Sequence, residues 1–190
     1  MQQASALGHH KVVKMLLTDP RVDPSAEDDY ALKEACGNSE TAVVQILLAD
    51  PRVNPATDNN RAIRKACSMC AASMRPGFSN AQLVEKSVDI VELLLNDPRV
   101  DPSAGEPSAM KIASKAGGMD LFQLLLTHPR TVVTKQALVY ADGGRHVQAV
   151  EQLVAEQPQV GPIKLNRSSL FRQEVYSCIL YADSFSTFFA

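Results

Sequence analysis

The sequence predicts an all-α protein, a solenoid of stacked helix pairs, and three recurring features carry this prediction. A proline-containing segment returns along the chain, an apolar block precedes each copy of it, and a shorter alanine-containing block lies upstream of each apolar block. Self-similarity of this kind is typical of repeat proteins, in which each unit packs only against its neighbours.

The recurring segment reads Asp-Pro-Arg-Val-Asp-Pro-Ser with small variations. Its copies begin at Asp19, Asp50 and Asp97, and a diverged fourth copy begins at His128. The first prolines of these copies stand at positions 20, 51, 98 and 129, so the first and last steps are equal and the middle step is longer. The equal step, from 20 to 51 and from 98 to 129, is the period of the repeat, and the longer step shows that one unit contains an insertion.

Each unit contains two helical signals. The longer signal has one polar position in six, and this wide apolar arc suits a helix pressed between two neighbours. The Asp-Pro or His-Pro that follows ends the helix, because the residue before a proline is pushed out of the helical region. The shorter signal repeats a small residue four positions after an alanine, which lets two helices approach closely. The second helices are expected at 12–17, 43–48, 90–95 and 121–126, and the first helices at 31–36, 62–67, 109–114 and 137–141.

Polar or turn-forming residues precede the first helices, as expected for an N-cap or the first helical residue. They are Asp29, Asn60, Pro107 and Thr134. Asp28, Asp29 and Asp58 recur with the period and are interpreted as turn formers and caps.

Three places depart from the repeat. The chain opens partway through a unit, with only Gln2 to Ala6 available as a first helix. The insertion at 68–86 is expected to lengthen the two helices around it into a projecting hairpin, tipped by Arg75 to Phe78. We divide the chain into repeats at 1–162 and, at 163–190, a C-terminal capping helix with an apolar tail.

The units resemble ankyrin repeats. Gly8-His9, followed by Val12-Val13 and Leu16-Leu17, is similar to the turn and second helix of that family, and the resemblance covers roughly residues 4–160. The family's Thr-Pro-Leu-His opening is Tyr30-Ala31-Leu32-Lys33 here, and the unit is shorter than the usual ~33 residues. A tighter loop than the family's β-hairpin is therefore expected. The resemblance implies protein binding through loops and first helices, and no chemistry of its own.

Other functional classes find little support in the composition. With 19 basic and 21 acidic residues, the net charge of −2 creates no field that would attract nucleic acid or an anionic membrane. The chain has neither the apolar core of a signal peptide at its start nor an apolar run that approaches a membrane span. We therefore expect a cytoplasmic protein, with the nucleus as the alternative.

The candidate chemical motifs have simpler explanations. Cys67 and Cys70 suggest a redox or zinc site, but Cys36 lies one period before Cys67, so Cys36 and Cys67 are expected at the same small core position. Two cysteines cannot complete a four-ligand zinc site. His9 and His10 belong to the turn and have no nucleophile beside them. No enzymatic activity, metal or cofactor is predicted.

The predicted function is a protein-binding scaffold or adaptor, and the alternative is the substrate-recruiting arm of a ligase or kinase whose catalytic domain lies outside this chain. Positions that differ between aligned units can encode a partner, whereas repeated positions serve stacking. The candidate binding residues are Tyr30, Arg61, Ser108 and Gln136 at one outward position, Lys33, Arg64 and Lys111 at the next, and Arg75 and Phe78 at the hairpin tip. Tyr30 and Arg61 are the strongest candidates, because tyrosine and arginine are frequent at interface centres.

Overall fold

The structure, a computed structural model, describes residues 1–74, 80–116, 119–128 and 130–131. This part of the chain is helical and contains no strand, which confirms the all-α prediction for the residues described. The helices are α1 (Gln2–Ala6), α2 (His10–Thr18), α3 (Ala26–Gly37), α4 (Thr41–Leu48), α5 (Thr57–Ser73), α6 (Ala81–Asn96), α7 (Ala109–Ala116) and α8 (Met119–Thr127).

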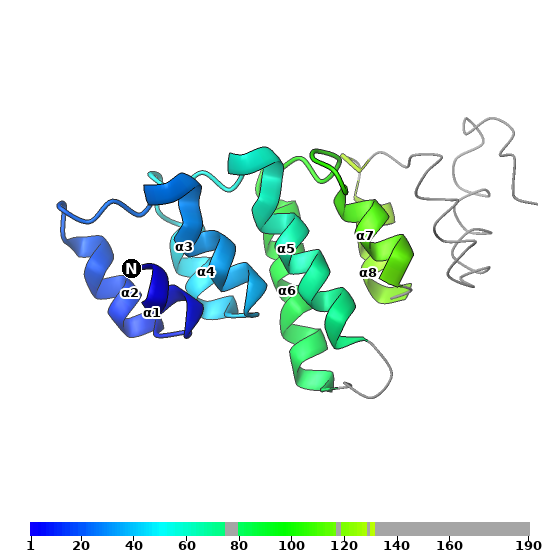
Figure 1. The fold of residues 1–190 in the computed structure, drawn as a ribbon, viewed down its shortest axis with the longest axis horizontal. Coiled ribbons are helices and arrows are strands. Elements are labelled where there is room, and N and C mark those ends of the chain that lie inside the picture. Colours follow the sequence, from blue (N-terminus) through cyan, green and yellow to red (C-terminus); the bar gives the residue numbers. More distant parts are fainter. Residues whose placement is uncertain (75–79, 117–118, 129, 132–190) are drawn as a thin grey trace, which may run out of the picture.

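The helices form two rows of antiparallel pairs (Figure 1). The first helix of each pair packs against the first helix of the next, so that α1, α3, α5 and α7 make one row, and α2, α4, α6 and α8 make the other. Each first helix also packs against the second helix of its own pair. The long loops between pairs lie along one edge of the rows (Figure 1).

Small side chains separate the helices of the first row. Ala31 and Ala35 of α3 are buried, as are Ala62 and Ala66 of α5 and Ala109 and Ala113 of α7. An alanine places only its Cβ between two helices, so the backbones can approach closely. The apolar side chains of these blocks that the structure describes in α4, α6 and α8 are buried or half-buried, as predicted, and α2 is the exception because parts of its block are exposed.

The repeated Asp-Pro-Arg-Val-Asp-Pro loop contains two successive Asx turns, in which an Asp or Asn side chain accepts a hydrogen bond from a backbone N–H two residues later. Asp19 and Asp97 have extended backbone, so the helix ends before the proline as predicted. In the three copies that open with Asp, this Asp accepts a hydrogen bond from the arginine N–H two residues on. The fifth residue of the motif, Asp or Asn, accepts from the N–H two residues beyond it in the same way. The valine of the motif is buried in the second and third copies.

A left-handed turn stands at the start of α3 and of α5. Glu27, Asp28 and Asp29 have φ of 56°, 57° and 59°, and residues 58–60 repeat this conformation with φ of 52°, 52° and 58°. Each left-handed residue costs on the order of 1–3 kcal/mol, and Asp and Asn adopt the conformation most easily among residues with a side chain. The acidic and amide residues expected as turn formers therefore occupy a real turn.

The expected caps are corrected in part. Asp29 and Asn60 stand where the regular part of the helix begins, but their side chains accept hydrogen bonds from the loop after the second helix. Ser108, and not Pro107, is the capping residue of α7, since its Oγ accepts from the Lys111 N–H at 3.4 Å. Thr134 lies outside the described residues.

The helices on either side of the insertion are longer than those of the preceding pair. Helix α5 has 17 residues and α6 has 16, against 12 in α3 and 8 in α4, in agreement with the expected lengthening. The added part of α6 lies against the previous unit, where the Ser87 and Ser39 hydroxyls are 2.7 Å apart. Both Arg75 and Phe78 at the expected tip, and the whole of the expected capping segment at 163–190, lie outside the described residues.

Candidate protein-binding surface

The structure places two of the predicted binding residues at the surface and two others in the interior. Tyr30 and Arg61 are exposed on α3 and α5. Lys33 and Ser108, which were expected to face outward, are buried. Arg64 and Lys111 are half-buried. Gln136, Arg75 and Phe78 lie outside the described residues.

The burial of Lys33 has a structural cause. The turn at the start of the next first helix lies over this position, and the Lys33 ammonium is 3.7 Å from the carboxylate of Asp58 in that turn. Arg64 repeats the arrangement one unit later: its guanidinium donates to the carbonyl of Glu106 at 3.4 Å and to that of Asp58 at 3.0 Å. These basic side chains therefore connect neighbouring units and are not a free recognition surface.

Four side chains on α3 and α5 assemble into a polar cluster. The Lys65 ammonium is 2.5 Å from the Glu34 carboxylate and 5.8 Å from the centre of the Tyr30 ring. Arg61 lies one turn before Lys65, and its guanidinium is 3.4 Å from Asp58. The hydrogen bond from Lys65 lowers the pKa of the Glu34 carboxyl, and the Tyr30 hydroxyl contributes in the same direction.

A shallow groove of about 310 Å³ adjoins this cluster. It lies between the carboxyl-terminal halves of α3 and α5 and is lined by Glu34, Gly37, Asn38, Lys65, Ser68, Met69 and Ala72. Its walls combine an apolar strip with groups that can form hydrogen bonds. We call the cluster and the groove together the α3–α5 surface.

Sequence reasoning missed Glu34 and Lys65 as members of this surface. Lys65 follows Glu34 by one full repeat period, so the two occupy the same position in adjacent units. Side chains at equivalent positions of stacked units lie side by side, and opposite charges at one position therefore pair. This spacing was a signal available in the sequence.

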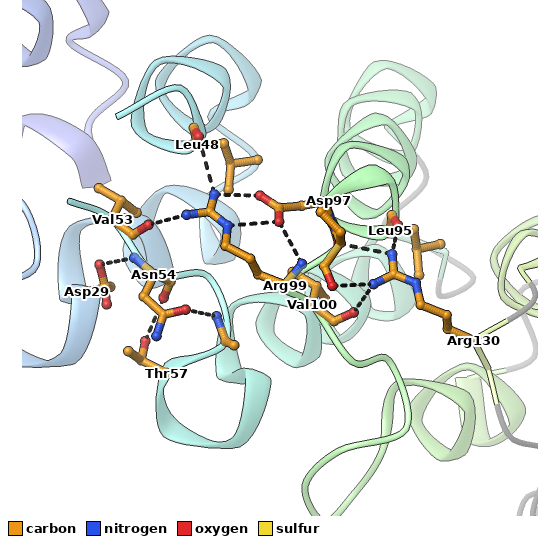
Figure 2. Close-up of polar contacts among 12 residues, drawn as sticks. Asp29, Leu48, Val53, Asn54, Thr57, Leu95, Asp97, Arg99, Val100 and Arg130 are labelled. Carbon is orange, nitrogen blue, oxygen red and sulfur yellow. Dashed lines mark hydrogen bonds and ion pairs between the residues drawn. The ribbon is translucent and has the colours of Figure 1, made fainter. Parts of the chain in front are cut away.

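The arginines of the repeated loop form a ladder along the edge of the protein, and Figure 2 shows its last two members. Arg52 donates to the carbonyls of Leu17 and Val22 in the preceding unit, at 3.1 and 3.2 Å. Arg99 donates in the same way to the carbonyls of Leu48 and Val53, at 3.5 and 2.7 Å. These carbonyls belong to the end of the previous second helix and its loop.

Arg130 continues the ladder. Its guanidinium binds the equivalent carbonyls of Leu95 and Val100, together with those of Asp97 and Pro98. Carbonyls at helix ends lack a partner inside the helix and carry partial negative charge, so a guanidinium is a suitable donor to them. The sequence signal for the ladder was the return of arginine in all four copies of the loop.

Arg52 and Arg99 are also held by the aspartate two residues before each of them. Arg99 forms a two-pronged ion pair with Asp97, with the closest atoms 2.6 Å apart. This hydrogen bond lowers the pKa of the Asp97 carboxyl and raises that of the guanidinium. The aspartate thus orients the arginine guanidinium toward the preceding unit.

A second type of bond closes each unit on itself. The buried Asp29 carboxylate accepts from the Asn54 N–H at 2.9 Å, so the start of α3 is tied to the loop after α4 (Figure 2). Asn60 does the same for α5 by accepting from the Asp101 N–H at 2.8 Å. Burial raises the pKa of the Asp29 carboxyl, although the bond to Asn54 opposes this.

The cysteines of the described residues are core residues. Cys36, Cys67 and Cys70 are buried free thiols, which confirms that Cys36 and Cys67 share one small core position. Burial raises the pKa of Cys36 to about 12 and that of Cys70 to about 11, and it raises the pKa of Cys67 as well. Within the described ranges no three His, Cys, Asp or Glu side chains gather as a metal-binding group. None of the helices described has the length and apolar character needed to cross a bilayer.

Comparison with known proteins gives no relative: no protein family, no curated protein and no solved structure matches the chain.

Proposed function

We propose that this protein is a non-enzymatic scaffold for protein binding, built as an ankyrin-like solenoid, and that the α3–α5 surface is its recognition site. The observation that carries the proposal is a cluster of four side chains beside an open groove, namely Tyr30, Glu34, Arg61 and Lys65. The two helices that carry them, α3 and α5, pack against the second helices of their own pairs.

The helices that carry the surface are closely packed against their neighbours. The first helices pack closely through buried alanines, and the arginine ladder joins the successive loops at their ends. A surface supported in this way loses little conformational entropy when a partner binds. This supports a role in recognition for the exposed residues in front of it.

The cluster offers the chemistry that protein interfaces use. Tyr30 and Arg61 provide a large contact area and directional hydrogen bonds. The Lys65 and Met69 side chains line the groove together with Asn38 and Ser68. The best-fitting partner is a protein segment that places an apolar side chain in the groove and polar groups against the tyrosine and arginine.

The test is a comparison of the full chain with the double variant Tyr30→Ala/Arg61→Ala. Each immobilised protein is exposed to extract from its native source, and captured proteins are compared by quantitative mass spectrometry. We expect captured partners to lose about fivefold or more in affinity, equivalent to about 1 kcal/mol. The fold should be retained, because both side chains are exposed.

A matched control changes exposed residues on the other row, in the variant Gln45→Ala/Glu92→Ala on α4 and α6. This variant should capture the same partners as the unchanged chain. Equal capture by the folded Tyr30→Ala/Arg61→Ala variant would remove the α3–α5 surface from the proposal. Loss of capture in both variants would contradict a site confined to the first helices.

A further inference from the structure

The N-terminal end of the two rows, formed by α1, α2 and the loop after α2, has an unusual surface (Figure 1). Val12 is 46% exposed, whereas Val43, Ile90 and Leu121 at the equivalent position of the other second helices are fully buried. Met15 is 73% exposed, and its equivalents are half-buried. The difference is that α4, α6 and α8 each have a preceding unit packed against them.

The polar groups of this end follow the same pattern. The Arg21 side chain is 87% exposed, against 39% for Arg52 and 38% for Arg99. Arg21 keeps the bidentate ion pair with Asp19, so its guanidinium is oriented like those of the other ladder arginines. Within the described part of the chain, it has none of the contacts to backbone carbonyls that the other three make.

A groove beside this loop completes the face. It measures about 360 Å³ and lies between the start of α1 and residues 22–26. In the next two units the corresponding space holds a left-handed turn, whose Asp29 or Asn60 accepts a hydrogen bond from the N–H of Asn54 or Asp101. The equivalent residue here, Asp23, lines the groove, and its N–H has no acceptor among the residues described.

We propose that this N-terminal face binds a helix pair of the same repeat type, together with its loop and the acidic left-handed turn that follows. Such a partner presents two backbone carbonyls to Arg21, an apolar second helix to Val12 and Met15, and an Asp or Asn side chain to the Asp23 N–H. The internal junctions of this chain show each of these contacts formed. The N-terminal face is separate from the α3–α5 surface, so the inference does not depend on the proposed function.

The experiment supplies the partner in its most direct form. A copy of residues 26–56, which is one complete repeat unit, is fused before a copy of residues 26–31, and this segment is fused before Met1 of the full chain. The second copy ends at residue 31 because Met1 is equivalent to Leu32 of the next unit, so the repeat continues without a gap. Thermal unfolding is then measured for the chain and the extended chain, each with and without Arg21→Ala. In the chain, Arg21→Ala should leave the midpoint unchanged, since the side chain bonds only to its neighbour Asp19 in the described structure. In the extended chain it should lower the midpoint by as much as Arg52→Ala lowers that of the chain.

Oxidation of Met15 by dilute peroxide gives a second readout that does not depend on stability. We expect the rate at Met15, followed by peptide mass spectrometry, to fall severalfold in the extended chain. An Arg21→Ala variant without effect in the extended chain, together with unchanged Met15 oxidation, would overturn the proposal. A concentration-dependent dimer of the unextended chain that the added unit abolishes and that Arg21→Ala leaves intact would also overturn it, because a second copy would then cover the face without the proposed contacts to Arg21.

Discussion

Replacing Arg99 by alanine isolates the contribution of the arginine ladder. The substitution removes the two hydrogen bonds to the Leu48 and Val53 carbonyls of the preceding unit, and it also removes the partner of Asp97. Since the ladder joins successive units, the expected result is a less stable protein with unchanged helices.

The magnitude follows from the geometry. A hydrogen bond from a charged donor contributes about 1.5–3 kcal/mol. The bond to Val53 is short, at 2.7 Å, whereas the one to Leu48, at 3.5 Å, contributes little. The side chain is 38% exposed, so water replaces part of what is lost. We expect the free energy of unfolding to fall by ~1.5–2 kcal/mol, which lowers the melting temperature of a chain of this size by about 3–8 °C.

Thermal unfolding followed by far-ultraviolet circular dichroism measures this change, and the chain contains its own control. Arg21→Ala removes the same side chain and the same pairing with an aspartate, but no contact to another unit in the described structure. Its midpoint should not move. Equal shifts in the two variants would refute the reasoning, because the loss would then come from the Asp-Arg turn that both loops share.

Three further predictions follow from buried and paired groups. In Asp29→Asn the new side chain should still accept the hydrogen bond from the Asn54 N–H, as Asn60 accepts the equivalent bond in its own unit. This variant should be slightly more stable at pH 7 because a buried charge is removed, whereas Asp29→Ala should lower the free energy of unfolding by about 1 kcal/mol. Urea unfolding of both variants tests this. The pKa of the Asp97 carboxyl is lowered in the folded state, so the stability that its ionised form contributes should be complete above the unfolded value near 3.8 and should be lost as the pH falls through the folded value. The slope of melting temperature against pH below pH 4 should therefore be smaller in Arg99→Ala. An unchanged slope would contradict the pairing of Asp97 with Arg99. Cys36 and Cys67 should not react with iodoacetamide at pH 8 until urea unfolds the chain, because burial raises the pKa of both thiols and blocks access to them. Labelling is followed by peptide mass spectrometry, and labelling of the folded chain would contradict their burial.

Much of the candidate site could not be predicted from its residues one at a time. Lys33 was expected outward because its position varies between the aligned units, but the turn carrying Asp58 covers it from the next unit. Tyr30 and Arg61 were identified because they vary between units, and both are exposed. Glu34 and Lys65 were missed because each belongs to the site only through the other, across a helix-helix contact.

The sequence by itself determined where the helices lie and which faces they bury. The apolar blocks and the alanines four residues apart predicted the buried residues of α3 to α7, and the Asp-Pro pairs predicted where the second helices end. These features could be read from the sequence because they depend on interactions within four residues and on the helical period.

Only the tertiary structure decided what the polar residues of the loops do. The left-handed turns at 27–29 and 58–60 have a local cost, and each turn's bond to the loop at the far end of its own unit, 25 or 41 residues along the chain, offsets part of that cost. The ladder arginines bind carbonyls that lie 30 to 51 residues earlier in the chain. Such contacts depend on the rotation and distance between successive units, which arise from the packing of all the helices together and are not encoded in any single local pattern.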